Sequence, residues 1–215
     1  MKFVMSYSCG KDSTLALHKL IKRGDEPVAL LVMMNCNVER SFFHGADRKM
    51  LERYAEALEI PLILCDTNGE DYHIAMETGL LKAVELGAEY ACFGDIDIES
   101  NRKWAEERCR KVGLTPIFPL WNNSRVENVY ELIDEGYSCL IKTINKNLLP
   151  VEILGKIMDR NILGIMKNCG IDLCGENGEY HTLVVDGPIF KRPIKFKTGK
   201  VMEFGEYPAI EVVID

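Results

Sequence analysis

No stretch of this sequence is apolar for long enough to cross a bilayer. The opening residues, MKFVMSYS, also hold too short an apolar run for a secretory signal peptide. Low-complexity tracts are missing as well, while 47% of the 215 residues are apolar, which places the chain outside the disordered class. We therefore expect a folded, cytoplasmic protein without a membrane partner.

Paired cysteines of the metal-binding kind are missing. None of the eight cysteines forms a CxxC pair, and Cys169 and Cys174, the two nearest in sequence, lack the spacing of a zinc site. Several others lie inside apolar runs, where a free thiol acts as a small buried hydrophobe. The sequence thus predicts neither a disulfide framework nor a structural metal.

The chain has fewer basic than acidic residues. Lysine and arginine total 26 against 33 aspartates and glutamates, which gives a net charge of −7. Because nucleic-acid binders gain most of their affinity by neutralising phosphates, this balance argues against nucleic acid as a partner. In the one basic stretch, 191–200, charged and apolar residues alternate within PIKFKTG, and we expect a strand with a solvated charged face there.

What the sequence does contain is a regular alternation of strands and helices over residues 2–120. Short apolar runs typical of buried parallel strands take turns with longer runs that have helical spacing. The expected strands are 2–7, 27–35, 61–65, 88–96 and 115–120, and the expected helices are 12–24, 46–59, 71–87 and 100–113. This order predicts an α/β fold with a doubly wound parallel sheet covered by helices on both faces.

The pattern changes after Trp121. We expect a helix at 126–135, a strand at 137–144, a helix at 151–159, a glycine-rich segment, CGENGEYHT, at 174–182, and a β-rich run at 182–190. This mixture predicts a smaller α+β domain over 122–215, packed against a first domain over 1–121.

The first expected strand and helix are joined by the segment SCGKDS at 8–13. Backbone N–H groups and the dipole at a helix start favour an anion. Gly10 permits close backbone approach, and the hydroxyls of Ser8 and Ser13 can donate to phosphate oxygens. Lys11 adds a positive charge, and Asp12 suits a magnesium ion that bridges phosphates. The segment therefore predicts a nucleotide phosphate site with Mg²⁺ at Asp12.

Two commoner phosphate motifs are missing here. A Walker A loop would need glycine in place of Met5 and a hydroxyl residue in place of Asp12, and no GxGxxG occurs. The alternative interpretation is a plain strand, turn and helix, with Ser8 as turn former and Asp12 or Ser13 as the helix N-cap. The position at the first βα junction of a doubly wound pattern favours the phosphate site.

SCGKDS resembles the SGGxDS loop of the N-type ATP pyrophosphatases, a PP-loop superfamily that cleaves ATP between the α and β phosphates. Three further segments resemble, in order and spacing, the diphthine-ammonia ligase branch: FGDI at 93–96, PLW at 119–121 and CGENGEYHTLVVDGPIF at 174–190. The resemblance covers nearly the whole chain. It implies a Rossmann-like, adenine nucleotide alpha hydrolase-like ATP-binding domain over 1–121 and a substrate domain over 122–215.

The resemblance further implies an AMP-forming ligase. In that family a carboxylate is adenylated with release of pyrophosphate, and ammonia then displaces AMP to give an amide. The carboxylate belongs to diphthine, a modified histidine on translation elongation factor 2, and a bacterial source would imply a related carboxylate. No glutaminase segment is visible in the 215 residues, which favours free ammonia as the nitrogen donor. The oligomeric state is left open, with a homodimer as one option.

The resemblance also implies roles for individual residues. ATP would be bound by Ser8, Cys9, Gly10, Lys11, Asp12, Ser13, Gly94 and Asp95, catalysis would use Lys11, Asp12, Glu176 and Glu179, and the second substrate would meet Asn177, Gly178, Tyr180 and His181. Glu176 and Glu179 would orient that substrate or deprotonate ammonium, with His181 as a further candidate for the proton transfer.

Simpler interpretations of both segments exist. Gly94-Asp95 suits an ordinary turn before a helix, and Asn177-Gly178 is by itself a hairpin signal. However, a hairpin does not require two glutamates, a tyrosine, a histidine and Thr182 around those glycines. The polar cluster therefore favours a site.

Two positions depart from the family pattern. Cys9 stands where the loop usually has its second glycine, so either that position needs no positive φ or the loop geometry is shifted. Residues 96–104, IDIESNRKW, differ from the usual tyrosine- and glutamine-containing segment, which bears on the protein substrate more than on the chemistry.

Two other functions would use the same loop. An RNA-modifying enzyme of the thiolase type would activate a base carbonyl, but the acidic net charge and the lack of paired catalytic cysteines argue against it. A non-catalytic ATP-binding module would not need the polar cluster at 176–182.

Overall fold

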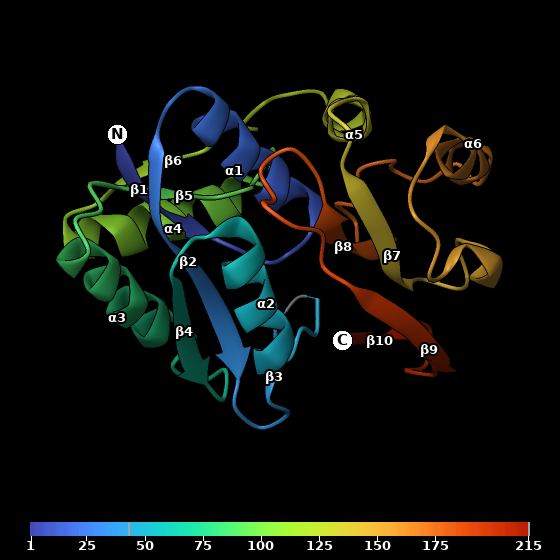
Figure 1. The fold of residues 1–215 in the computed structure, drawn as a ribbon, viewed down its shortest axis with the longest axis horizontal. Helices are drawn as coiled ribbons and strands as arrows, with labels where there is room; N and C mark the ends of the chain where they lie inside the picture. The colour runs from blue at the N-terminus through green and yellow to red at the C-terminus, as the bar shows by residue number, and fades with distance from the viewer. Residues whose placement is uncertain (43, 215) are drawn as a thin grey trace. The chain divides into compact units, whose positions relative to one another are not determined.

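A computed structural model describes residues 1–42 and 44–214 (Figure 1). The chain forms two compact units. Unit 1 comprises Met1–Ser8 and Asp12–Asn123, and unit 2 comprises Cys9–Lys11 and Ser124–Asp215. The short segment Cys9–Lys11 thus belongs to unit 2 by its contacts, although the chain on both sides of it belongs to unit 1.

Unit 1 is built on a mostly parallel sheet. Its strands are β1 (Lys2–Ser6), β2 (Glu26–Asn35), β4 (Leu62–Thr67), β5 (Tyr90–Cys92), β6 (Thr115–Ile117) and the two-residue β3 (Arg40–Ser41), which pairs antiparallel with the end of β2. The parallel strands run in the order β4-β2-β1-β5-β6. The direction of chain progress reverses between β1 and β5, and open parallel sheets bind ligands outside the carboxyl ends of their strands at such a reversal. The predicted doubly wound sheet is confirmed.

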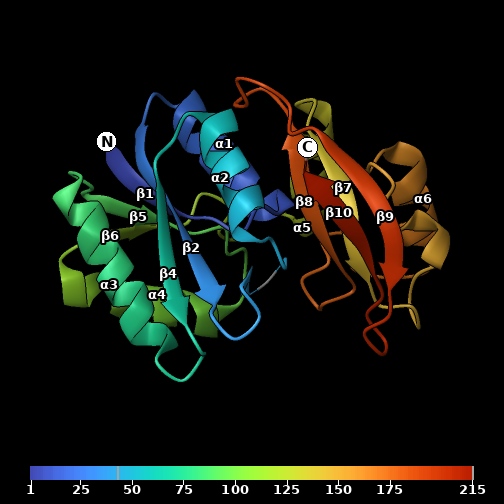
Figure 2. The same cartoon turned by 60° about the horizontal axis from the view of Figure 1, so that its bottom comes forward.

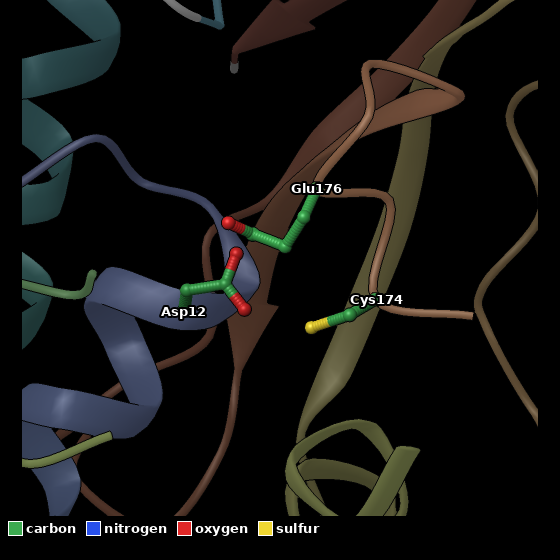
Figure 3. A group of neighbouring side chains, drawn as sticks. All are labelled: Asp12, Cys174 and Glu176. Carbon is green, nitrogen blue, oxygen red and sulfur yellow. The ribbon is translucent and has the colours of Figure 1, made fainter. Parts of the chain in front are cut away.

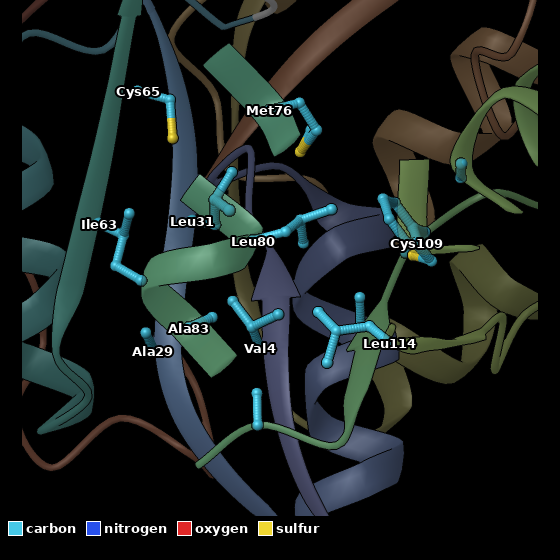
Figure 4. Packing of buried hydrophobic residues seen from close by; sticks show 14 of the residues in the cluster. Val4, Ala29, Leu31, Ile63, Cys65, Met76, Leu80, Ala83, Cys109 and Leu114 are labelled. Carbon is cyan, nitrogen blue, oxygen red and sulfur yellow. The ribbon is translucent and has the colours of Figure 1, made fainter. Parts of the chain in front are cut away.

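Helices cover both faces of this sheet (Figure 2). They are α1 (Lys11–Lys22), α2 (Arg48–Leu58), α3 (Tyr72–Glu85) and α4 (Glu99–Val112). On one face, Val4 of β1 and Leu31 of β2 pack with Leu80 of α3 in an apolar cluster that α4 also joins (Figure 4). Phe3 and Met5, whose side chains point to the opposite face, are buried as well. Burial on both faces explains why these strands are almost continuously apolar.

Unit 2 contains an antiparallel sheet and two helices. The strands β7 (Ser138–Ile144), β8 (Tyr180–Asp186), β9 (Phe196–Met202) and β10 (Ala209–Ile214) are ordered β8-β7-β10-β9. The helices are α5 (Arg125–Asp134) and α6 (Arg160–Asn168), and a 3₁₀ turn, η1, spans Val151–Ile153. The edge strand β9 exposes Lys197 and Lys200, in keeping with the basic strand that the sequence predicts. In the described part of the chain, no helix has the length and apolar character to cross a membrane.

The predicted helix over 151–159 is wrong. After η1 the chain turns at Gly155, which has φ = 72°, and runs extended beside β7. Its backbone bonds to that strand: Ile141 N donates to Lys156 O at 2.9 Å, and Met158 N donates to Cys139 O at 2.7 Å. The helix begins only at Arg160, where the N-cap Asp159 accepts from Ile162 N at 2.8 Å. Apolar residues that suggested a helical face therefore belong to an extended segment.

All eight cysteines carry free thiols, and six of them are buried. Burial raises the pKa of the Cys9 thiol well above its usual value and that of Cys65 to about 11. Because the thiolate is the nucleophilic form, such buried thiols are inert packing groups rather than sulfur carriers.

Candidate functional site

The predicted phosphate loop, residues 8–13, follows β1 at the reversal point of the sheet in unit 1. Its two serines, Ser8 and Ser13, come together: Ser8 N donates to Ser13 Oγ at 3.2 Å, and their hydroxyl oxygens lie 3.0 Å apart. α1 begins at Lys11, so the first backbone N–H groups of that helix belong to loop residues. The sequence-predicted hydroxyls and helix start thus occur at one turn.

Cys9 adopts the conformation that glycine would adopt. Its φ is 66°, and its side chain is fully buried. The interpretation that this position needs no positive φ is therefore wrong. A residue with a Cβ is destabilised in the left-handed region by about 1–2 kcal/mol, so Cys9 stores strain in the loop.

In unit 2, the middle of the loop is hydrogen-bonded to β8. Val184 N donates to Cys9 O at 2.8 Å, and Lys11 N donates to Thr182 Oγ1 at 3.2 Å. The Lys11 side chain is buried, with Nζ 5.6 Å from the ring centroid of Tyr180. Two residues predicted for different substrates, Lys11 and Tyr180, are therefore neighbours. Thr182 belongs to the polar cluster that the sequence indicates, although no role was predicted for it, and Val184 was not predicted.

Gly94 lets the end of β5 approach the start of α1. A Cβ placed on Gly94 would lie 2.9 Å from Ser13 N and 3.0 Å from the carbonyl carbon of Asp12. Both atoms belong to backbone, which cannot move aside cheaply. Gly94 is therefore required for close approach, which goes beyond the ordinary turn considered as an alternative.

Asp95, the next residue, is electrostatically coupled to Asp12. Burial raises the pKa of the Asp95 carboxyl, a hydrogen bond from Asn101 opposes this, and the negative charge of Asp12 raises the pKa further. Two carboxylates whose charges repel each other at the carboxyl edge of a parallel sheet present the oxygen ligands that Mg²⁺ prefers. The donor set of unit 1 therefore fits a magnesium ion.

Glu179 organises the polar segment before β8. Its buried carboxylate accepts hydrogen bonds from Asp172 N at 3.2 Å, Asn177 N at 3.0 Å and Asn177 Nδ2 at 3.1 Å. Three donors from the same segment thus converge on one side chain. Glu179 is suited to hold the segment in shape, and its predicted catalytic role stays a prediction.

A second carboxylate, Asp172, folds the other half of this segment. It accepts from Cys174 N at 2.9 Å and Glu176 N at 3.4 Å, and it forms an ion pair with Arg125 of α5 at 2.5 Å. Neither Asp172 nor Arg125 was predicted from the sequence. The signal for Asp172 is local, because an aspartate that caps the second residue after it is a common turn former.

Cys174 and Glu176 project from this segment, whereas Asp12 projects from the start of α1 (Figure 3). No strand lies between α6 and β8 in the described residues, so Asn177-Gly178 is not a hairpin turn. At the entry to β8, Tyr180 donates its hydroxyl proton to Leu173 O at 2.6 Å, and His181 lies opposite Thr143 of β7. Tyr180 is thereby fixed at both its ring and its hydroxyl.

Unit 1 also has a cavity beside the loop, at the carboxyl ends of β1 and β2. It measures about 70 Å³ and is lined by Ser6, Tyr7, Ser8, Leu31, Val32, Met33, Ser41, Phe42 and Tyr72. A larger cavity of about 550 Å³ lies between β4 and α3, and none of the predicted site residues lines it. The smaller cavity adds Tyr7 and Tyr72 to the surroundings of the loop, and neither was predicted because both resemble ordinary core aromatics.

The fold defines a doubly wound α/β protein with the segment SCGKDS at its first βα junction. Residues 1–116 match the family model of the diphthamide synthase N-terminal domain, and residues 124–211 match that of the diphthamide synthase C-terminal domain. The chain therefore belongs to the diphthamide synthase family.

The names of individual relatives agree with this family. The diphthine–ammonia ligase of Rattus norvegicus is 26% identical, over 94% of this chain and 85% of its own length. That of Danio rerio is 27% identical, over 90% of this chain and 86% of its own. A solved structure from Methanocaldococcus jannaschii, described as a predicted subunit of tRNA methyltransferase, is 17% identical with a TM-score of 0.46, over 90% of this chain and 100% of that chain. This last likeness carries no conclusion about function.

Replacing Gly94 with alanine should disturb the loop through unit 1. We expect the new methyl group to push against the backbone of Ser13, weaken ATP binding about tenfold and cost about 1–3 kcal/mol of stability. Gly164→Ala is the matched control: nothing lies within 4 Å of its added Cβ, and alanine in α6 should stabilise slightly. Thermal unfolding and calorimetric titration with ATP check both. Unchanged affinity and stability in Gly94→Ala would contradict the close-approach argument.

Proposed function

We propose that this protein is an ATP-dependent ligase that adenylates the carboxylate of diphthine on translation elongation factor 2 and transfers ammonia to it. The observation that carries the proposal is the phosphate loop whose buried Lys11 lies against Tyr180 and Thr182 of β8. The proposal is also supported by the family to which the chain belongs, since relatives of this chain are named diphthine–ammonia ligase. Residues 1–121 would bind ATP and residues 122–215 would bind the substrate.

The first task of such a site is to stabilise the negative charge on the phosphates. The ammonium of Lys11 and the N–H groups at the start of α1 would stabilise the charge that develops on the leaving pyrophosphate. Ser8, Gly10 and Ser13 would contact phosphate oxygens. Mg²⁺ held at Asp12, with Asp95 beside it, would neutralise phosphate charge and orient the triphosphate.

Proton transfer from ammonium is the second task. Glu179 accepts three hydrogen bonds from its own segment, which suits it to hold that segment in shape. We assign the proton transfer from ammonium to Glu176, whose side chain extends from the same segment (Figure 3). Asn177, Gly178 and His181 would border the bound carboxylate.

The products formed from ATP test the ligase assignment, because they show which phosphate bond is broken. Incubation with ATP, Mg²⁺, diphthine-bearing elongation factor 2 and ammonium should yield AMP and pyrophosphate, resolved by chromatography. Lys11→Met keeps the apolar stem but removes the charge, so it should slow the reaction by about 10²-fold or more. Lys22→Met, at the exposed end of the same helix, should leave the rate unchanged. ADP and phosphate as products would refute the ligase, and no turnover of bound ATP would favour a binding module.

Glu176→Gln tests the proton transfer. We expect ATP affinity within about twofold of the unaltered protein and amide formation lowered about 10²-fold, because the amide keeps the shape but cannot accept the proton. The deficit should shrink as pH rises, since free ammonia becomes more abundant without help from a base. Glu152→Gln, exposed in η1, is the control. A deficit that is the same at every pH, or a loss of ATP affinity, would exclude Glu176 as the base.

A further inference from the structure

The middle of the phosphate loop depends on β8 for its conformation. Cys9 is held in the left-handed region, which a residue with a Cβ keeps only where its surroundings fix it. The hydrogen bonds from Val184 N to Cys9 O and from Lys11 N to Thr182 Oγ1 lie on either side of Gly10. Both partners are β8 residues, and they are spaced two apart on that strand.

Thr182 makes the contact that bears most directly on nucleotide binding. Its side chain is 1% exposed, and its hydroxyl oxygen accepts the N–H of the first residue of α1. One of the N–H groups that a helix start offers to an anion is therefore used to attach the loop to β8. The same contact fixes the backbone from which the Lys11 side chain extends to the Tyr180 ring.

We propose that Thr182 is a positioning residue for ATP: its hydroxyl holds Lys11 and the strained loop in the phosphate-binding conformation. The proposal rests on the proposed function only in taking ATP as the ligand of the loop. Because the Glu179-organised segment leads directly into β8, the strand that carries Thr182 is continuous with the proposed substrate segment. ATP affinity thus depends on a residue far from the loop in sequence.

Isosteric substitution provides the test. Thr182→Val keeps the shape but removes the acceptor, so it should weaken binding of α,β-methylene-ATP with Mg²⁺ about tenfold. Thr182→Ser keeps the hydroxyl and should restore affinity to within about twofold. Thr198→Val, exposed on β9 of the same sheet, should bind like the unaltered protein. Titration calorimetry gives the affinities, and thermal unfolding verifies that each variant is folded.

A folded Thr182→Val variant with unchanged affinity would overturn the proposal, as would a Ser variant that is no better than Val. Failure of the unaltered protein to bind the ATP analogue would instead refute the proposed function. Hydrogen exchange covers the case in which Thr182→Val does not fold. In the unaltered protein without nucleotide, the Lys11 amide should exchange slowly because Thr182 holds it, and unprotected exchange would overturn the proposal.

Discussion

The attachment of Cys9 and Lys11 to β8 is the constraint on which the proposed chemistry depends. Cys9, Gly10 and Lys11 follow a strand of the parallel sheet, yet their contacts are with the antiparallel sheet of unit 2. Their conformation is costly at Cys9, so it must be stabilised from outside the loop. A binding site that needs backbone amides in fixed directions gains from such an external attachment, because the ligand need not order the loop itself.

The carboxylates of the candidate site fall into two groups with different surroundings. Asp172 and Glu179 are occupied by hydrogen bonds within their own segment and give it its shape. Asp12 and Asp95 interact electrostatically at the carboxyl edge of the parallel sheet, where a cation would relieve their repulsion. These environments separate the carboxylates that hold their own segment from the pair to which the proposed function assigns a metal, a distinction that residue type alone does not make.

Sequence patterns predicted the parallel sheet well because its strands are buried on both faces and are therefore apolar throughout. The place of the loop between β1 and α1 could be predicted from the residues around it, whereas its binding of phosphate stays a prediction. The positive φ of Cys9 could not be predicted, since a cysteine rarely adopts a glycine-like conformation and the hydrogen bond from Val184 to Cys9 O joins residues far apart in sequence.

Two other features could not be predicted from the sequence, each for a different physical reason. The role of Thr182 rests on a hydrogen bond across 171 residues of sequence, which no local pattern reveals. The helix expected at 151–159 failed because its apolar residues equally suit an extended segment, and the backbone bonds to β7 decide between the two. Gly155 was the local sign against a continuous helix, since its φ of 72° ends the turn there.

Exchange of radiolabelled pyrophosphate into ATP is the most direct measurement of the central claim, that a carboxylate is activated as its adenylate. We expect exchange that requires Mg²⁺ and the diphthine-bearing factor but proceeds without ammonium, because adenylation precedes attack by ammonia. Amide formation from ATP without any carboxylate-dependent exchange, accompanied by release of ADP, would contradict this claim.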